Sequence, residues 1–546
     1  MKGQTHRFPW ADGSDSSVWI VHFGSKSTPL IAQLCREIGL RSCTLTPKEL
    51  TAAWQDGVCQ QQLPALVILS GGDASVYDPD APRIDPALLS EIRQRATVFG
   101  ICYGAQLLAQ HCGGQVRRAA AAEFGPVDIV TEPSFDHCRY RGGRAVMNHR
   151  DEITKLPQGW RVFASSERCR HALVGTDRIL AVQFHPEMDH TEEGDELLRH
   201  VAFDVAGCRR DYSFDPQVFV GECRAWMTQT IGRQVSVCGL SGGVDSSVAF
   251  TIARSVLKKS RLLGIFIDTG WYRERESEEV RGFFGSDGVS YVDASQKFHT
   301  AIERIPYPTT GHPTEREHRY YEDVRRVIGN EFVDSFIAKA TWTRMNPRVL
   351  IQGTNAADVI ESNTGLKSHH NVSGLPVKMA VDIVEPLAGL YKFEIRRLAA
   401  FLGLPEEIVH RQPFPGPGLA VRSWGPLNRL DAEPLRRANG ILEEVIRKHY
   451  PKPADRPCQY YCALAKLPST GLMGDSRVIG YAWWVRLVEA GERESYATLG
   501  VFEPTPAFRA ELSHRLTTEV VMPDGTPFVR VAIEITGKPP STVEPH

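Results

Sequence analysis

Residues 235–248, which read VSVCGLSGGVDSSV, restrict the possible folds of this chain more than any other stretch. Their first half is a short apolar run typical of a buried strand in a parallel sheet. Apolar residues then recur at helical spacing from Val248 to Val256. Between strand and helix lies the loop SGGVDS. Backbone N–H groups and serine hydroxyls of such a loop can converge on an anion at the positive end of the helix, and a Cβ at either glycine would hinder that approach.

The hexamer SGGVDS resembles the pyrophosphate loop of the ATP pyrophosphatase family, whose members cleave ATP to AMP and pyrophosphate. It is not the G-x-x-x-x-G-K-[ST] phosphate loop, because no lysine follows the glycines. The resemblance implies that Asp245 binds Mg²⁺, since a pyrophosphate leaving group needs a hard cation between its oxygens. A glycine turn without a ligand is the alternative interpretation. The implied ATP-binding residues of the loop are Ser241, Gly242, Gly243, Val244, Asp245, Ser246 and Ser247.

The overall composition predicts a chain of about three globular domains, because 546 residues exceed what one hydrophobic core supports. A formal net charge of −2 gives no electrostatic reason to expect nucleic acid or a membrane surface as a partner. The cysteines are scattered without a C-x-x-C pair, which argues against a disulfide framework or zinc site. The first sixteen residues hold no apolar core of the signal-peptide type, and no apolar run reaches membrane-spanning length. We therefore expect a cytoplasmic protein.

A second turn of special shape is Gly100-Ile101-Cys102-Tyr103-Gly104, between a predicted strand and a predicted helix. A nucleophile flanked by small residues in such a turn is exposed above the sheet on strained backbone. The dipole of the following helix favours a thiolate at its N-terminus. Cys102 is therefore a candidate nucleophile.

His185 and Glu187 follow a predicted strand over Ile179–Val182. On an extended backbone, residues two apart project to one face, which suits a histidine base oriented by a carboxylate. An isolated His-x-Glu motif more often consists of ordinary surface residues than of a catalytic pair. Together with the cysteine turn upstream, it indicates covalent catalysis.

These motifs resemble those of class I glutamine amidotransferases. The resemblance implies an oxyanion hole built from backbone N–H groups. The implied residues are Cys102, His185 and Glu187 as the catalytic triad, Gly72 and Tyr103 as oxyanion donors, and Gln106 as a contact for glutamine. Two segments depart from the family pattern. Asp73 stands where the family has proline after its glycines, and residues 148–151 (NHRD) replace its His-Gly-Asp loop. Both segments lie near the expected glutamine pocket.

The alternation of apolar strands and helices continues through the middle of the chain. After SGGVDS, an apolar strand over Leu262–Ile267 precedes helices at Glu276–Phe284 and Phe332–Ala340. This order predicts a second doubly wound parallel sheet, with ligands outside the carboxyl ends of its strands. A helix over Leu435–His449 and an alternating strand near residues 529–535 follow. The predicted fold class is α/β: two doubly wound parallel-sheet domains, then a smaller α+β C-terminal domain.

Further motifs narrow the resemblance to the GMP synthase family, over nearly the whole chain. They are KSHHNV at 367–372, RQPFPGPGL at 411–419, Met473-Gly474-Asp475-x-Arg477, and a tail with Gly537-Lys538-Pro539-Pro540 and Glu544. The resemblance implies that Lys367 neutralises charge on the transferring phosphoryl group of ATP. It also implies that the C-terminal domain binds XMP and forms a homodimer. The implied XMP-binding residues are Arg325, Asp475, Lys538 and Glu544.

By the same resemblance, the expected activity is glutamine-hydrolysing GMP synthesis with ATP and Mg²⁺. XMP is adenylated, and ammonia from glutamine displaces AMP to give GMP. The expected partners are the small molecules XMP, glutamine and ATP. The expected domains are a polar extension at 1–16, an amidotransferase domain at 17–207, an ATP pyrophosphatase domain at 208–411 and an XMP-binding and dimerisation domain at 412–546.

Several departures from the family leave two alternatives open. The lid between Glu361 and Lys367 is short, residues 354–358 (TNAAD) differ from the family motif, and Leu467–Thr470 replaces a segment with arginine. The stretch 492–508 has no readable counterpart, and the tail reads Pro545-His546. The chain could therefore be a paralogous amidotransferase acting on another purine-like compound in a specialised pathway. The second alternative is an inactive regulatory homologue.

Overall fold

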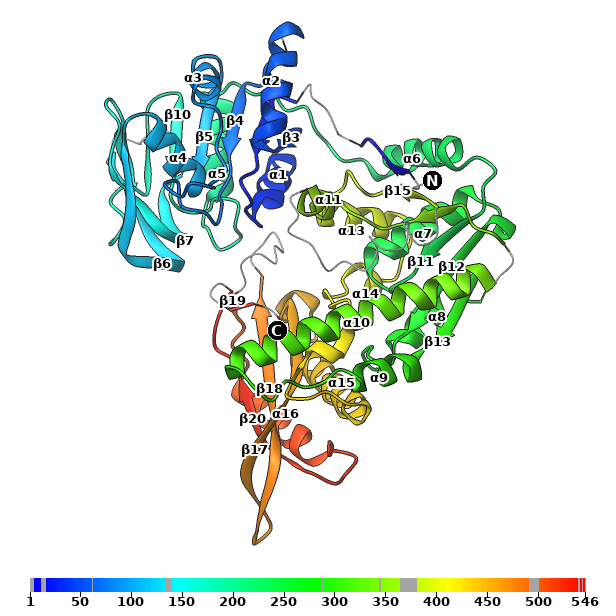
Figure 1. The fold of residues 1–546 in the computed structure, drawn as a ribbon. Coiled ribbons are helices and arrows are strands. Elements are labelled where there is room, and N and C mark those ends of the chain that lie inside the picture. Colours follow the sequence, from blue (N-terminus) through cyan, green and yellow to red (C-terminus); the bar gives the residue numbers. More distant parts are fainter. Residues whose placement is uncertain are drawn as a thin grey trace.

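The structure is a computed structural model. It describes residues 4–10, 16–60, 62–133, 140–286, 288–342, 345–363, 381–490, 500–538, 541–542 and 544–545. Three sheets organise these residues. In Figure 1 the first sheet lies in the blue and cyan part of the ribbon and the third in the orange and red part, whereas the second lies mainly in the green part and includes the dark blue strand near the N-terminus.

The first sheet has nine strands in the order β3-β2-β4-β5-β10-β9-β8-β6-β7. Strands β3 to β10 in that order pair in parallel, as predicted. The last four add an antiparallel extension that the sequence did not reveal. The strands are β2 (Val18–Val21), β3 (Ser42–Leu45), β4 (Leu66–Leu69), β5 (Thr97–Ile101), β6 (Gln115–Thr131), β7 (Gly142–Lys155), β8 (Arg161–Ser165), β9 (Leu173–Gly175) and β10 (Ile179–Val182). The helices are α1 (Thr28–Glu37), α2 (Pro47–Gln60), α3 (Pro86–Arg95), α4 (Tyr103–His111) and α5 (Gly194–Arg199).

The second sheet is entirely parallel, in the order β1-β15-β14-β11-β12-β13. Its strands are β1 (Thr5–Arg7), β11 (Ser236–Gly239), β12 (Leu262–Asp268), β13 (Val289–Asp293), β14 (Val349–Ile351) and β15 (Asp382–Glu385). Its helices are α6 (Pro216–Ile231), α7 (Val244–Val256), α8 (Glu276–Phe284), α9 (Ser295–Glu303), α10 (Pro313–Trp342), α11 (Ala356–Asn363), α13 (Lys392–Phe401) and α14 (Glu406–Val409). The edge strand β1 comes from the predicted polar extension, to which the sequence assigned no structure.

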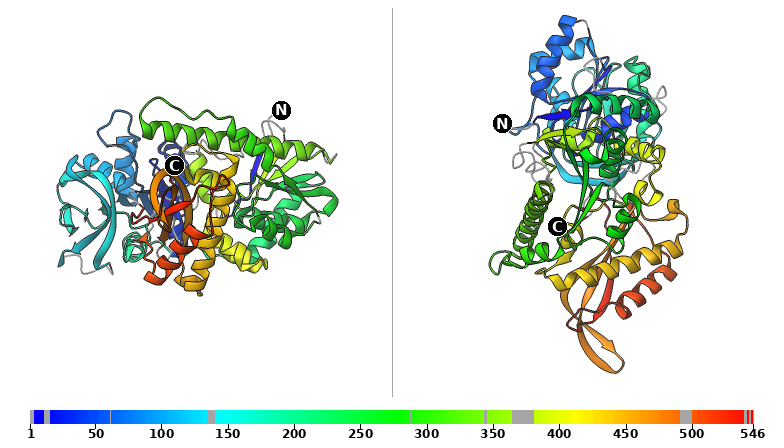
Figure 2. Two further views of the ribbon diagram at one scale, coloured as in Figure 1. Left: turned by 90° about the horizontal axis from the view of Figure 1, so that it is seen from below. Right: turned by 90° about the vertical axis from the view of Figure 1, so that its right-hand side faces the viewer.

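The third sheet contains β16 (Ser423–Trp424), β17 (Gln459–Met473), β18 (Ser476–Glu489), β19 (Gly500–Val501) and β20 (Phe528–Ile533), with β20 parallel to β18. Helices α15 (Ala432–His449) and α16 (Pro506–Thr518) accompany it. The ends of β17 and β18 extend beyond the rest of the domain as a long hairpin (Figures 1 and 2). This mixed architecture agrees with the predicted α+β domain.

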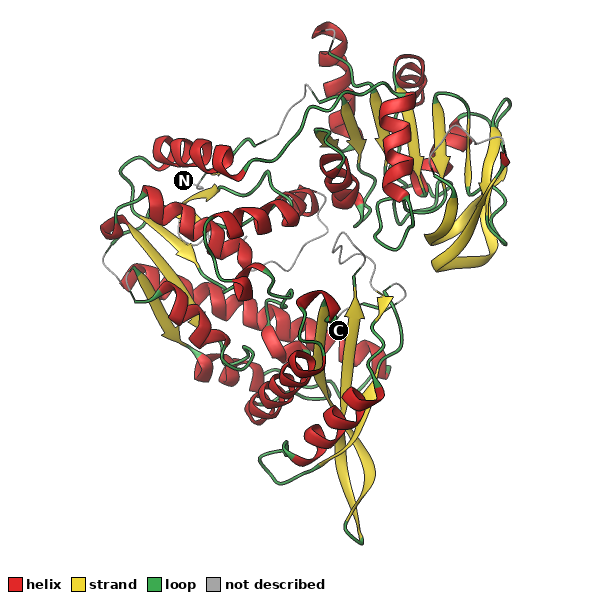
Figure 3. Cartoon of the chain, turned by 180° about the vertical axis from the view of Figure 1, so that it is seen from behind, coloured by secondary structure: helices red, strands yellow, loops and turns green. Residues whose placement is uncertain are grey.

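Helices lie on both faces of the first two sheets (Figure 3), as a doubly wound fold requires. Alternate residues of the parallel strands therefore enter different cores. Val18 and Ile20 of β2 belong to one buried cluster, whereas Trp19 and Val21 belong to another. One large cluster joins the second sheet to the C-terminal domain. No helix among the described residues is long and apolar enough to cross a membrane.

A buried ion pair joins the first two parts of the chain. The Arg36 guanidinium on α1 donates to Glu394 Oε2 on α13 at 2.9 Å and to the Gly389 carbonyl at 2.6 Å. The exposed fractions of the two charged side chains are 6% and 0%. The guanidinium also lies over the rings of Tyr212 and Tyr391, at 5.0 and 4.8 Å from their centres. Burial without a partner would be costly for either charge, so the pair fixes how α1 meets α13.

Two candidate active sites

Cys102 occupies a strained turn between β5 and α4. Its backbone has φ of 51° and ψ of −107°, in the region that favours glycine. The flanking glycines are needed for space. A Cβ at Gly104 would lie 2.2 Å from the carbonyl oxygen of Leu69, and one at Gly100 would lie 2.8 Å from the backbone of Ala105. The turn therefore has the predicted strain and puts the thiol at the start of α4, but Cys102 is only 5% exposed, so the prediction that it is exposed above the sheet is wrong.

His185 and Glu187 form a buried pair beside this thiol. His185 Nδ1 lies 2.8 Å from Glu187 Oε1. Burial lowers the pKa of His185, but the charge of Glu187 and the nearby Cys102 thiol outweigh it and raise the pKa to about 10. An imidazolium at neutral pH stabilises a neighbouring thiolate. The predicted extended backbone is wrong, because the chain turns at Pro186 and Glu187 after β10. The turn, rather than the alternation of a strand, brings the two side chains together.

Gly72 and Tyr103 border the same site. A Cβ at Gly72 would lie 3.3 Å from the ring of Tyr103, and one at the neighbouring Gly71 would lie 3.2 Å from Cε1 of His185. This crowding brings the backbone of the glycine loop close to the triad, as an oxyanion donor requires. The side chain of Gln106 donates to the backbone carbonyl of Asp151 at 2.8 Å. It thereby holds the segment 148–151.

The divergent segment 148–151 lies against the nucleophile. The Asn148 carbonyl oxygen is 3.7 Å from Cys102 Sγ. His149 is buried and lies 3.2 Å from Glu123 across the β6–β7 ladder, and burial is the main cause that lowers its pKa. Tyr77 donates to Asp151 at 2.7 Å. Sequence comparison alone located this segment near the pocket but did not show that a carbonyl of it contacts the thiol.

The SGGVDS loop joins β11 to α7. Gly242 has a φ of +81°, and its carbonyl accepts a hydrogen bond from Arg411 at 2.9 Å. The hydroxyls of Ser241 and Ser246 are 3.1 Å apart, and no side chain caps the N-terminus of α7 at Gly243. The first N–H groups of a helix of 13 residues thus lie behind a small, hydroxyl-lined loop. This arrangement suits a phosphate group.

Asp245 of this loop pairs with a lysine that the sequence did not single out. Lys392 Nζ, at the start of α13, lies 2.6 Å from Asp245 Oδ2. The other carboxylate oxygen, Oδ1, is buried and has no hydrogen-bond partner among the described residues. The sequence could have indicated Lys392, because this residue follows a strand of the parallel sheet, and the ligand was expected at the carboxyl ends of those strands.

The residues expected to bind XMP do not all come together. Glu544 accepts two hydrogen bonds from the buried Arg422 side chain, at 3.1 and 3.0 Å. Arg325 lies on α10, where it pairs with Glu322 at 2.7 Å. Asp475 is exposed in the turn at the tip of the β17–β18 hairpin. Lys367 lies outside the described residues.

The cationic neighbours of Lys538 come from two parts of the chain. Burial, followed by the charges of Lys26 and Arg486, lowers the pKa of Lys538. Lys26 precedes α1, whereas Arg486 lies on β18. From Ser476 to Arg486 the strand rises about 33 Å at ~3.3 Å per residue. The hairpin tip with Asp475 is therefore remote from Lys538 within one chain.

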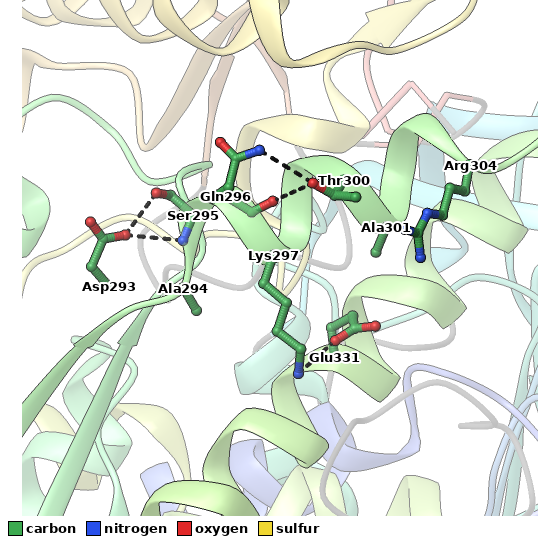
Figure 4. A pocket seen from close by; sticks show the side chains of 9 residues that line it. All are labelled: Asp293, Ala294, Ser295, Gln296, Lys297, Thr300, Ala301, Arg304 and Glu331. Carbon is green, nitrogen blue, oxygen red and sulfur yellow. Dashed lines mark hydrogen bonds and ion pairs between the residues drawn. The ribbon is translucent and has the colours of Figure 1, made fainter.

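A cavity of about 620 Å³ lies at the end of β13, between α9 and α10. In Figure 4 the Lys297 side chain points toward Glu331, and their ion pair measures 2.8 Å. Asp293 accepts hydrogen bonds from the backbone and hydroxyl of Ser295 at the start of α9. None of the residues predicted to act in catalysis or binding lines this cavity.

Comparison with known proteins follows the same division of the chain. Residues 19–205 match the family model described as class-I glutamine amidotransferase, residues 223–295 match that of NAD synthase, and residues 449–545 match that of the GMP synthase C terminal domain. A class-I amidotransferase domain joined to an NAD synthase-like domain defines the class of this protein, an amidotransferase that is also an ATP-using ligase.

Curated relatives then give the family. The GMP synthase [glutamine-hydrolyzing] of Thermomicrobium roseum is 36% identical over 99% of this chain and 98% of its own length. The enzyme of Symbiobacterium thermophilum is 37% identical over 96% of this chain and 98% of its own length. The enzyme of Thermus thermophilus is 37% identical over 96% of this chain and 99% of its own length. The chain belongs to the family of glutamine-hydrolysing GMP synthases.

Proposed function

We propose that this chain makes GMP from XMP by two linked reactions. Glutamine is hydrolysed at Cys102, and the ammonia released aminates an XMP that ATP has adenylated at its C2 oxygen. The observation that carries the proposal is the coexistence of a strained, buried Cys-His-Glu site and the SGGVDS loop in one chain. A regulatory protein would have no need of a nucleophile held at φ of 51°.

At the first site, the Cys102 thiolate attacks the side-chain amide carbon of glutamine. The backbone N–H groups of Gly72 and Tyr103 stabilise the oxyanion that forms. Protonated His185 gives its proton to the leaving ammonia, and Glu187 keeps the ring oriented and charged. Water then hydrolyses the thioester to release glutamate, with His185 as the base.

At the second site, the C2 oxygen of XMP attacks the α-phosphorus of ATP, and pyrophosphate leaves. A ring carbonyl oxygen is a poor leaving group, whereas the AMP that ammonia later displaces is a good one. Backbone N–H groups at the start of α7, with the Ser241 and Ser246 hydroxyls, would hold the departing pyrophosphate. Lys538 and Arg325 supply positive charge for the phosphate of XMP.

We place Mg²⁺ at Asp245, whose buried Oδ1 is available while Oδ2 pairs with Lys392. A carboxylate oxygen is the type of ligand that Mg²⁺ prefers. When bound, the ion would neutralise charge on the pyrophosphate oxygens. Lys392 shares the same carboxylate and so positions it for the metal.

We also propose a cytoplasmic homodimer. The β17–β18 hairpin exposes several large apolar side chains, which a second copy of the chain could cover. Their exposed fractions are 64% for Leu467, 77% for Leu472, 46% for Met473 and 70% for Ile479. A dimer would also give Asp475 at the hairpin tip an opportunity to reach a partner's XMP site. Ile479→Lys should then raise the dimer dissociation constant in sedimentation experiments, whereas Thr518→Lys on the exposed end of α16 should leave it unchanged.

The test of the activity is product identification by mass spectrometry, with glutamine, ATP, Mg²⁺ and a panel of purine nucleotides, nucleosides and bases that includes XMP. We expect GMP, AMP, pyrophosphate and glutamate in equal amounts. Cys102→Ala should abolish the glutamine-driven reaction and leave the ammonia-driven reaction intact. Amination of another panel member in place of XMP would favour a specialised pathway, and no product with either nitrogen donor would favour a regulatory homologue.

A further inference from the structure

The segment Gln4–Trp10, which we name the N-terminal strap, belongs to the second sheet although the first sheet follows it in sequence. Its strand β1 pairs in parallel with β15, with Thr5 opposite Ile383 and Arg7 opposite Glu385. Backbone bonds continue at both ends, from Ile383 N–H to Gln4 at 2.8 Å and from Phe8 N–H to Glu385 at 3.2 Å.

Aromatic packing anchors the end of the strap. Phe8 is buried, and its ring centre lies 5.3 Å from that of Phe219 and 5.4 Å from that of Trp226, both on α6. Trp10 lies so close to Gly389 that a Cβ there would be 2.5 Å from the Trp10 carbonyl oxygen. The strap is therefore held on the second sheet by its side chains as well as by its backbone.

From this strap, Arg7 reaches a buried carboxylate. Arg7 Nε donates to Glu385 Oε2 at 2.8 Å, and the exposed fraction of the Glu385 side chain is 7%. The other oxygen, Oε1, accepts a hydrogen bond from the Thr354 hydroxyl at 2.7 Å. Glu385 thus connects the strap to the loop that follows β14.

That loop packs directly on the SGGVDS segment. A Cβ on Gly353 would lie 2.7 Å from the backbone carbon of Asp245 and 2.8 Å from the backbone nitrogen of Ser246. The two backbones leave no room for a methyl group at Gly353, so a shift of the neighbouring Thr354 would be transmitted to Asp245 and Ser246. Arg7, Glu385, Thr354 and the SGGVDS loop therefore form one continuous set of contacts.

We propose that Arg7 is a positioning residue for the ATP site, acting through Glu385 on Thr354 and so on the pyrophosphate loop. The proposal rests on the proposed function, because it assigns ATP to that loop. Loss of Arg7 would leave a largely buried carboxylate without this cation and free Glu385 to turn from Thr354. ATP binding should weaken, whereas the glutamine site on the other sheet should be unaffected.

The experiment compares Arg7→Ala and Arg7→Lys with wild type in ammonia-driven synthesis, with ATP and XMP varied separately. We expect Arg7→Ala to raise the KM for ATP roughly 3- to 10-fold and to leave the KM for XMP and glutamine hydrolysis within experimental error. Arg7→Lys, which keeps the charge, should recover most of the loss. Arg95→Ala is the matched control, because Arg95 is a half-exposed arginine paired with Glu91 at 3.3 Å on the first part of the chain.

A double-mutant cycle separates positioning from a general loss of stability. Thr354→Val should also raise the KM for ATP. Because both residues act along one path, the double variant with Arg7→Ala should be no more impaired than the more impaired of the two single variants. Calorimetric titration of ATP without XMP gives the same comparison independently of the product, so a failure of the proposed function would not hide the result. An unchanged affinity for ATP in Arg7→Ala would overturn the proposal. Additive effects, or equal losses in every activity together with a lower Tm, would also overturn it.

Discussion

Replacing Glu187 by glutamine tests the glutamine site most directly, because it removes one charge and keeps the shape. The exposed fractions of the His185 and Glu187 side chains are 4% and 1%. The rise in the pKa of His185 from 6.5 to about 10 corresponds to roughly 5 kcal/mol in favour of the imidazolium. Loss of one partner from a buried ion pair typically costs ~3–5 kcal/mol. We therefore expect Glu187→Gln to slow glutamine hydrolysis by about 10²- to 10⁴-fold.

The assay measures glutamate release and, separately, ammonia-driven product formation, which should keep its wild-type rate. Glu132→Gln, at an exposed position of the same part of the chain, is the control.

The sign of the pH effect follows from the raised pKa of His185. Stability from the pair is fully present below pH ~6.5 and is lost as pH rises through about 10, so Glu187→Gln should flatten this dependence. Glutamine hydrolysis within tenfold of wild type, with an intact fold, would refute this account of the triad.

Three further predictions concern the ATP site, the substrate phosphate and the nucleophile turn. Asp245→Asn should slow glutamine-driven and ammonia-driven synthesis alike, by about 10²-fold or more. The control variant Asp293→Asn on β13 should keep both rates. Normal pyrophosphate release by Asp245→Asn would contradict the role of Asp245 at the ATP site. Lys538→Ala should raise the KM for XMP by the loss of charge-assisted bonds worth ~1.5–3 kcal/mol, measured by initial rates, and a silent substitution would exclude it from the site. Gly104→Ala should lower the free energy of unfolding by about 3 kcal/mol or more, since its Cβ would lie 2.2 Å from the Leu69 carbonyl oxygen. An unchanged denaturation midpoint would show that the turn can relax.

Local features of the two sites could be predicted from the sequence because each lies within a few consecutive residues. The cysteine turn needs only its two glycines, and the SGGVDS loop needs only the strand before it and the helix after it. The strand boundaries Leu66–Leu69 and Ile179–Val182 also agree with the structure, because buried parallel strands are continuous apolar runs.

Features that depend on distant pairing could not be predicted. Strand β1 has only three residues and none of them is buried, so its sequence carries no strand signal, and it pairs with the edge of β15 more than 370 residues later. The ion pair of Lys392 with Asp245 likewise joins residues 147 positions apart. For His185 and Glu187, the residue spacing was informative but the assumed backbone was not, because Pro186 favours a turn.

The pair of Arg36 and Glu394 has a consequence for any attempt to divide the chain. If it were cut between α5 and α6, each fragment would present to water a charge that is almost fully dehydrated in the whole protein. Reassembly would then require both ions to lose their hydration together, which only the matching fragment could compensate. A fragment with a neutral residue in place of Arg36 or Glu394 would leave the opposite charge buried and unpaired on association, and would therefore bind its partner weakly. The two fragments would thus recognise each other through the charges of Arg36 and Glu394, which are buried in the intact molecule.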